Sequence, residues 1–282
     1  MVQEESISAL DITDFPIDDH CVGSKWTVDN EDQLAKLIAI VVMGQAVQAA
    51  HIIGELLPAI PAFTNDALQA EAIIKFTVQE VSQTPRIGYP RFQRDGLIFE
   101  IISWIAAKQV AGDKCFLKDP HISATSQGLD GIMIELTDDG SEISKSTIFE
   151  DKCTINPREM FRDNVIPGFI DRHSNTRSAE LISAAATLIQ LSGATDLEAM
   201  AMVNKVLDNN CRQYRAGFAL TSDFDNEDAQ KALFKGYEKI TDINQDQRIG
   251  ACLIVDDQLR DWFDTMAYKI ISCIQQFDGG QA

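Results

Sequence analysis

Three charged residues that could act together on a phosphate group lie in one stretch of the chain, residues 128–154. Asp130 precedes a short apolar run, GIMIEL, and Glu150 and Lys152 come near the end of a second run, STIFEDKCT. The polar segment TDDGSEISK joins the two runs, and this pattern predicts a β-hairpin. Because alternate side chains of a strand point to opposite faces, Glu150 and Lys152 share a face.

Two carboxylates and a lysine at one edge of a sheet suit the metal-assisted hydrolysis of a phosphodiester. Mg²⁺ takes oxygen ligands and keeps several waters, so one or two carboxylates and a substrate phosphate complete its shell; Mn²⁺ is the alternative ion. Such a metal polarises a phosphoryl oxygen and lowers the pKa of a bound water. A lysine beside it orients that water or offsets negative charge on the phosphate. The competing interpretation is a solvated surface ion pair, which contributes little.

These residues resemble the D…(D/E)-x-K signature of the PD-(D/E)XK nuclease superfamily, which has the restriction-endonuclease-like fold. The resemblance covers residues 92–222. It implies that Asp130 and Glu150 bind the metal together with the backbone carbonyl of Asp151, and that Lys152 is the catalytic lysine. Glu100, on the helix predicted before the first core strand, would be an auxiliary acid; the alternative is a glutamate at the border of that helix's buried stripe.

Asp151 departs from the family pattern, because the middle residue of the motif is usually apolar. We expect Asp151 either to form a salt bridge behind the sheet or to mark an edge strand. More narrowly, GLDGI and the E-x-K strand, followed by YRAGFALTSDF and RIGACLIVDD, resemble the nuclease subunit of Hachiman-type bacterial anti-phage defence systems. That resemblance implies a DNA-cleaving effector restrained by a helicase or ATPase partner.

The predicted order of elements is that of an α/β protein with a mixed central sheet. A helix over 94–111, a strand over 114–118, the hairpin, further helices, and strands in 211–224 and 248–257 agree with the αβββαβ core of the superfamily. A long amphipathic helix over 258–277 closes the chain. We therefore predict a nuclease core over residues 91–282, preceded by an acidic arm and a helical unit over residues 1–90.

The predicted N-terminal unit begins with an acidic segment, residues 1–30, interpreted as a solvated arm or a short edge strand. A long helix is expected over 30–57, and a second one from Thr64 or Asn65 to about residue 83. The segment 85–96, with Arg86, Arg91 and Arg94, is expected to be either a phosphate-contacting or a solvated loop.

After the hairpin, a helix is expected from Pro157 to the Pro167-Gly168 pair, and others over 176–192 and 196–209. Four arginines of this region make a candidate wall for phosphate contacts: Arg158, Arg162, Arg172 and Arg177.

Composition restricts the function further. The formal charge of −19 argues against a protein that coats nucleic acid by itself, because phosphate neutralisation supplies most non-specific affinity. The chain is therefore expected either to act with a basic partner or to bind DNA poorly by itself. The six cysteines form no C-x-x-C pair, and we see neither signal peptide nor membrane span, which predicts a cytoplasmic protein. The alternatives to a nuclease are a catalytically inactive interaction subunit of an ATPase complex and a hydrolase of small phosphate esters.

Overall fold

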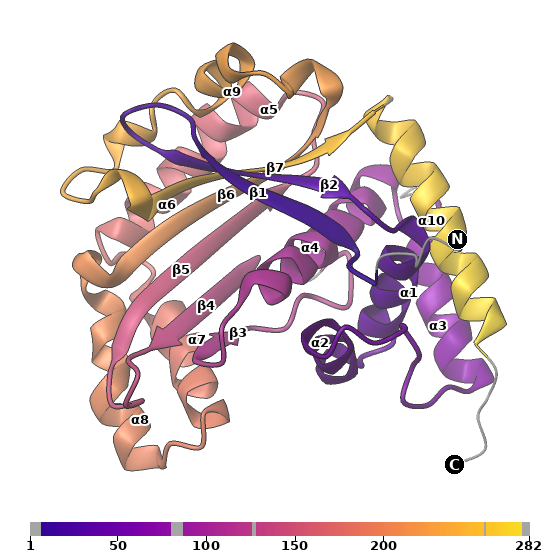
Figure 1. Ribbon diagram of the computed structural model, residues 1–282, viewed down its shortest axis with the longest axis horizontal. Helices are drawn as coiled ribbons and strands as arrows, with labels where there is room; N and C mark the ends of the chain where they lie inside the picture. The colour runs from indigo at the N-terminus through magenta and orange to yellow at the C-terminus, as the bar shows by residue number, and fades with distance from the viewer. Residues whose placement is uncertain (1–6, 80–86, 126–127, 257, 278–282) are drawn as a thin grey trace, which may run out of the picture.

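A curled, mixed sheet of seven strands runs through the middle of the molecule, with helices on both faces (Figure 1). The computed structural model describes residues 7–79, 87–125, 128–256 and 258–277. Strand order across the sheet is β1-β2-β7-β6-β5-β4-β3. The pairs β2–β7, β7–β6 and β6–β5 are parallel, and the pairs β1–β2, β5–β4 and β4–β3 are antiparallel. The strands are β1 (Leu10–Pro16), β2 (Val22–Val28), β3 (Cys115–Leu117), β4 (Gly131–Leu136), β5 (Ile143–Lys152), β6 (Arg212–Thr221) and β7 (Arg248–Val255).

Each face of the sheet has its own group of helices and its own hydrophobic cluster. On one face lie α1 (Glu31–Val42), α4 (Arg91–Val110) and α10 (Leu259–Gln276). The other face packs against α5 (Pro157–Met160), the π-helix η1 (Phe161–Val165), α6 (Ile166–His173), α7 (Ser178–Leu191), α8 (Asp196–Met202) and α9 (Glu227–Phe234). The remaining described helices are α2 (Ala46–Gly54), α3 (Asp66–Phe76) and five short 3₁₀ helices, η2 (Val203–Leu207), η3 (Asn209–Cys211), η4 (Ser222–Phe224), η5 (Tyr237–Lys239) and η6 (Gln245–Gln247).

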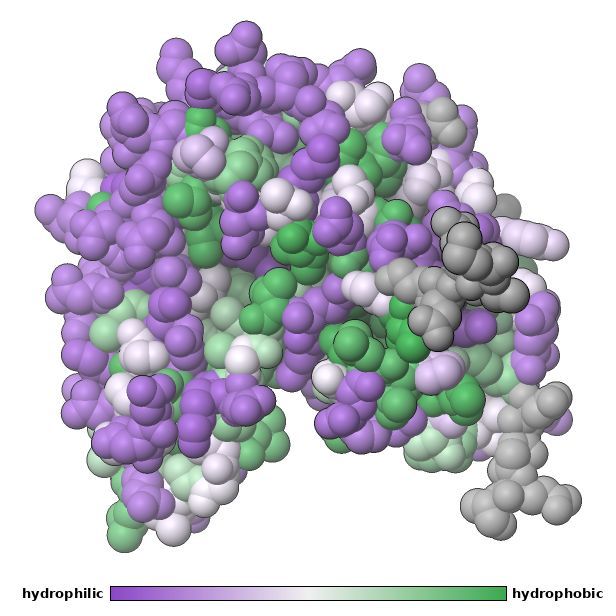
Figure 2. All heavy atoms as spheres, in the orientation of Figure 1, coloured by the Kyte–Doolittle hydropathy of each residue, from purple (hydrophilic) through white to green (hydrophobic). Residues whose placement is uncertain are grey.

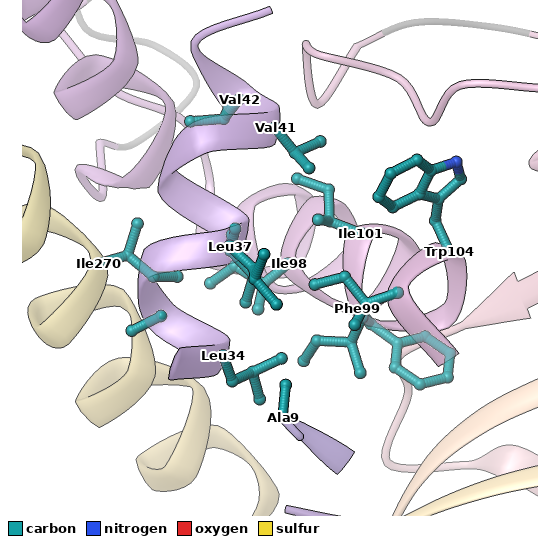
Figure 3. Packing of buried hydrophobic residues seen from close by; sticks show 14 of the residues in the cluster. Ala9, Leu34, Leu37, Val41, Val42, Ile98, Phe99, Ile101, Trp104 and Ile270 are labelled. Atoms are coloured by element: carbon teal, nitrogen blue, oxygen red, sulfur yellow. The ribbon is translucent and has the colours of Figure 1, made fainter. Parts of the chain in front are cut away.

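Strand alternation divides the core between the two faces. Neighbours such as Ile148 and Phe149 enter opposite clusters, because successive side chains of a strand leave on opposite sides. Figure 3 shows the first cluster, where Leu37 of α1 lies between Ile98 of α4 and Ile270 of α10. The α/β class and the mixed sheet predicted from the sequence are thus confirmed.

Two stretches of the acidic N-terminal segment, Leu10–Pro16 and Val22–Val28, are strands of the sheet, which corrects the prediction of a solvated arm; residues 1–6 lie outside the described ranges. β1 and β2 form an antiparallel hairpin, and β2 then pairs in parallel with β7. Of these two strands, β1 lies at an edge of the sheet, as the alternative interpretation had it. Leu10 and Trp26 are buried, so apolar residues spaced among the acids supply the inward face. The division at residue 90 stays a prediction, although this hairpin and α1 share a sheet and a cluster with later elements.

The predicted helix over 30–57 is two helices, α1 and α2, because the chain turns at Gly44. Gly44 has a φ of +81°, a left-handed conformation that glycine adopts without steric cost. Gln45 follows as the N-cap of α2, and its side chain accepts from Ala62 N–H and donates to the carbonyl of Phe63. The second predicted helix ends early, at Phe76, and its predicted last residues beyond 79 lie outside the described ranges.

The predicted hairpin and the strand before it are confirmed as β4, β5 and β3, but the helix after them does not end at Pro167. It runs through a π-helical turn, Phe161–Val165, into α6, which continues to His173. A π-turn interrupts the i→i−4 hydrogen bonds of the helix. A proline that follows it, which has no backbone N–H to donate, therefore does not end the helix. This continuation carries Arg172 into the core.

Hydrophilic residues cover most of the face shown in Figure 2, and its outline is notched between the lobes that hold α8 and α2. Within the described residues, no helix has the length and apolar character needed to cross a bilayer.

Candidate functional site

Asp130, Glu150 and Lys152 meet at one end of the β4–β5 hairpin. Asp130 stands directly before β4, and Glu150 and Lys152 lie at the end of β5. Lys152 Nζ is 2.7 Å from Asp130 Oδ2 and 2.9 Å from Glu150 Oε2. Burial alone would lower the pKa of Lys152, but the charges and hydrogen bonds of the two acids outweigh it and raise the pKa above 10.5. Lys152 therefore remains an ammonium ion at neutral pH.

The site can be reached from solvent. The Lys152 side chain is 25% exposed and that of Asp130 22%, so a ligand can approach both groups. Just beyond the end of β5, a surface cavity of about 310 Å³ is lined by Thr154, Ile155 and Pro157, together with Arg260 of α10. Asp130 and Lys152 are thus partly exposed, Glu150 is less so at 14%, and none of the three lines this cavity.

Arg172 belongs to the site as a partner of Glu150, a contact that the sequence did not predict. Its guanidinium is 2% exposed, and Nη1 lies 2.7 Å from Glu150 Oε1. Arg212 of β6 donates to the Arg172 carbonyl at 2.6 Å and so fixes the end of α6. The sequence did place Arg172 in a locally basic region. Because the helix was predicted to end at Pro167, nothing in the sequence indicated that Arg172 lies on a helix and is buried.

Asp151 is buried behind the sheet, on the opposite face of β5 from Glu150. Ser103 Oγ of α4 donates to Asp151 Oδ2 at 2.6 Å, and Arg215 Nη2 of β6 lies 3.8 Å from Oδ1. Burial raises the pKa of Asp151 to about 7, against the opposing effects of Arg215 and Ser103. β5 lies between β4 and β6, so of the two expectations the salt bridge is confirmed and the edge strand is wrong.

Glu100 is paired with a loop residue. Glu100 Oε1 accepts the backbone N–H of His121 at 2.8 Å and lies 2.9 Å from its Nδ1. Lys118 Nζ is 3.5 Å from His121 Nε2 and donates to the carbonyl of Leu129 at 3.1 Å. In the described part of the chain, Glu100 forms no hydrogen bond or ion pair with the three central residues. Its auxiliary role stays a prediction.

The other arginines of the predicted basic wall have partners away from the three central residues. Arg158 donates to the carbonyls of Leu233 and Lys235, and Arg162 pairs with Asp163. Arg177 pairs with Glu180. In the earlier basic segment Arg91 and Arg94, now the start of α4, both bind Asp264 of α10, and Arg86 lies outside the described residues. Within the described ranges, Arg172 is the one arginine of the predicted wall that contacts Glu150.

The donor set at this site fits a hard divalent cation held by few protein ligands. Asp130 and Glu150 supply carboxylate oxygens, and Mg²⁺ accepts one or two such groups while it keeps several waters. Among the described residues, no group of three or more acidic, histidine or cysteine side chains is arranged to hold a metal. The carbonyl of Asp151, which the resemblance offers as a ligand, stays a prediction.

Comparisons of the chain with family models, with curated proteins and with solved structures found no match.

Proposed function

We propose that this protein is a metal-dependent nuclease of the PD-(D/E)XK type, which hydrolyses phosphodiester bonds of DNA. The observation that carries the proposal is the contact of Lys152 Nζ with both Asp130 and Glu150, at an accessible end of a β-hairpin. Along the chain, α4 is followed by β3, β4 and β5, then by helices, and then by β6. This order is compatible with the αβββαβ core that the resemblance implies.

The charged groups divide the work of hydrolysis between them. Asp130 and Glu150 would hold Mg²⁺ or Mn²⁺ through carboxylate oxygens. When bound, the ion supplies polarisation of a phosphoryl oxygen and a water of lowered pKa. Lys152, kept protonated by its acids, is suited to donate to a phosphate oxygen where negative charge develops. Arg172 holds Glu150 from the buried side and fixes its orientation.

The charge of the chain supports a protein partner. At −19, the chain repels the DNA backbone, so a partner with ATPase or helicase activity would supply affinity and restraint. In such an assembly this chain would be the effector subunit of an anti-phage defence complex, as the narrower resemblance implies.

The test is a cleavage assay on linear, circular and single-stranded DNA with Mg²⁺, with Mn²⁺ and with EDTA. We expect cleavage with metal and none with EDTA. Asp130→Asn, Glu150→Gln and Lys152→Met should each lower the rate by about 100-fold or more. The matched control is Lys145→Met with Glu135→Gln, which removes an exposed ion pair of 3.2 Å from the same hairpin. Wild-type cleavage by the double variant Glu150→Gln/Lys152→Met would overturn the proposal.

A second candidate function, a catalytically inactive interaction subunit, is favoured by exposed apolar residues in the N-terminal region. Leu56, Ile60 and Phe63 are each exposed to 59% or more, and Val47 on α2 to 81%. Exposed apolar groups of this size are typical of protein contacts when they gather in one patch. A chain that binds an ATPase but cleaves no DNA, alone or in the complex, would favour this function over the nuclease.

A further inference from the structure

Asp151 belongs to two parts of the molecule at once. Its backbone N–H donates to Asp130 Oδ2 at 2.9 Å, and the same oxygen accepts Lys152 Nζ at 2.7 Å. Its carboxylate leaves the opposite face of β5 and is buried against α4. The residue therefore connects the candidate site to the layer behind the sheet.

Two side chains from different elements hold the Asp151 carboxylate. Ser103 of α4 donates to it at 2.6 Å, and Arg215 of β6 lies 3.8 Å away and also donates to the Ser103 hydroxyl. The Arg215 guanidinium is itself seated 3.5 Å from the centre of the Phe149 ring. Through these contacts the carboxylate fixes the end of β5 relative to α4 and β6.

Gly217 provides the space for this arrangement. It pairs with Asp151 in the parallel register of β5 and β6. A Cβ at this position would lie 2.2 Å from Asp151 Oδ1 and 3.6 Å from Phe99 Cζ. The first distance is far inside van der Waals contact, so any larger residue would displace the carboxylate.

Stability alone does not explain a buried acid here. Replacing a buried ion pair with apolar residues of similar size is often neutral or stabilising, because desolvation offsets the attraction. The carboxylate also leaves Oδ1 without a hydrogen bond in the described structure. What the network does supply is a defined position for the main chain that contacts Asp130.

We propose that Asp151 is a positioning residue of the site, anchored by Ser103 and Arg215 in the space left by Gly217. Its anchored side chain keeps its N–H on Asp130 and thereby orients Asp130 toward Lys152. The catalytic consequence rests on the proposed nuclease function, whereas the structural consequence does not.

The experiment compares Gly217→Ala, Asp151→Ala and their double variant. It measures hydrogen exchange of the backbone amide at position 151, and DNA cleavage. Both single variants should speed exchange of this amide by about tenfold, because its hydrogen bond to a charged group is weakened. They should also lower kcat by about tenfold or more with little change in KM, since orientation is lost and binding is not. The double variant should match Asp151→Ala, because the atom with which the new methyl group collides is gone.

The matched control is Gly250→Ala on β7, whose Cβ would lie 2.6 Å from the Phe234 ring in the opposite cluster. It should lower the melting temperature without speeding exchange of the Asp151 amide. Exchange at the wild-type rate in both single variants, or additive effects in the double variant, would overturn the positioning role. If the wild-type chain cleaves no DNA, the proposed function fails and the exchange rates alone decide this proposal.

Discussion

Removal of the Glu150 carboxylate should destabilise the fold as well as the site. Glu150 accepts from Arg172 through Oε1 and from Lys152 through Oε2. Arg172 is 2% exposed, and its Nε has no hydrogen-bond partner in the described structure. Glu150→Ala would therefore leave a buried guanidinium without its acid, whereas Lys152 keeps Asp130.

The size of this effect follows from burial. Removing one member of a buried ion pair costs about 3–5 kcal/mol, because the remaining charge is desolvated and unpaired. Glu150 itself is 14% exposed, so water can partly replace it and the lower end, about 3 kcal/mol, is expected. The Lys152 contact adds little, since that side chain is partly solvated.

Urea unfolding in EDTA measures the prediction for Glu150→Ala, Arg172→Met and the double variant. The double variant has no stranded cation, so the two effects should be coupled by about 2 kcal/mol rather than add. The control is Glu227→Ala, which breaks an exposed pair of 3.5 Å with Lys231 and should cost less than about 0.5 kcal/mol. Additive effects, or a Glu150→Ala variant as stable as the control, would refute the reasoning. Cleavage assays should accordingly use Glu150→Gln, which keeps the shape of the side chain.

Two further predictions concern stability. The pKa of Asp151 is about 7 in the folded chain against an ordinary value of 3.8, so the folded chain binds this proton more tightly than the unfolded chain does. The free energy of unfolding that this provides is present at low pH and is lost as the pH rises from about 4 to 7. Asp151→Asn should remove this component, at most about 1.4 kcal/mol per pH unit, and unfolding curves of both proteins across that range measure it; a pH-independent difference would contradict it. Gly44→Ala should destabilise by about 1 kcal/mol, because its φ is +81°, whereas Gly54→Ala at the end of α2, with open space around it, should stabilise by about 0.5 kcal/mol. Melting temperatures that shift in the same direction for both glycine variants would count against this account of the α1–α2 turn.

The predicted elements that proved right are those with a strong local pattern. The β4–β5 hairpin follows from two apolar runs around a polar segment, β6 and β7 from short, largely apolar runs, and α10 from its amphipathic periodicity. The N-cap of α3 is Asn65, one of the two candidates that the sequence offered, and its side chain accepts from Leu68 N–H. The errors arose where two local signals compete. Gly44 ended a helix inside an otherwise helical pattern, and Pro167 failed to end one because a π-turn accommodates it.

By itself, the sequence determined that Glu150 and Lys152 share a face of one strand and that Asp130 lies at the start of the strand before it, because strand alternation and the hairpin pattern are local. Only the tertiary structure decided what surrounds them. Arg172 reaches Glu150 from α6, Asp151 is anchored by α4 and β6, and the acidic N-terminus completes the sheet beside β7. These contacts join residues far apart in the chain, and they depend on how helices and strands pack, which no local spacing of residue types encodes.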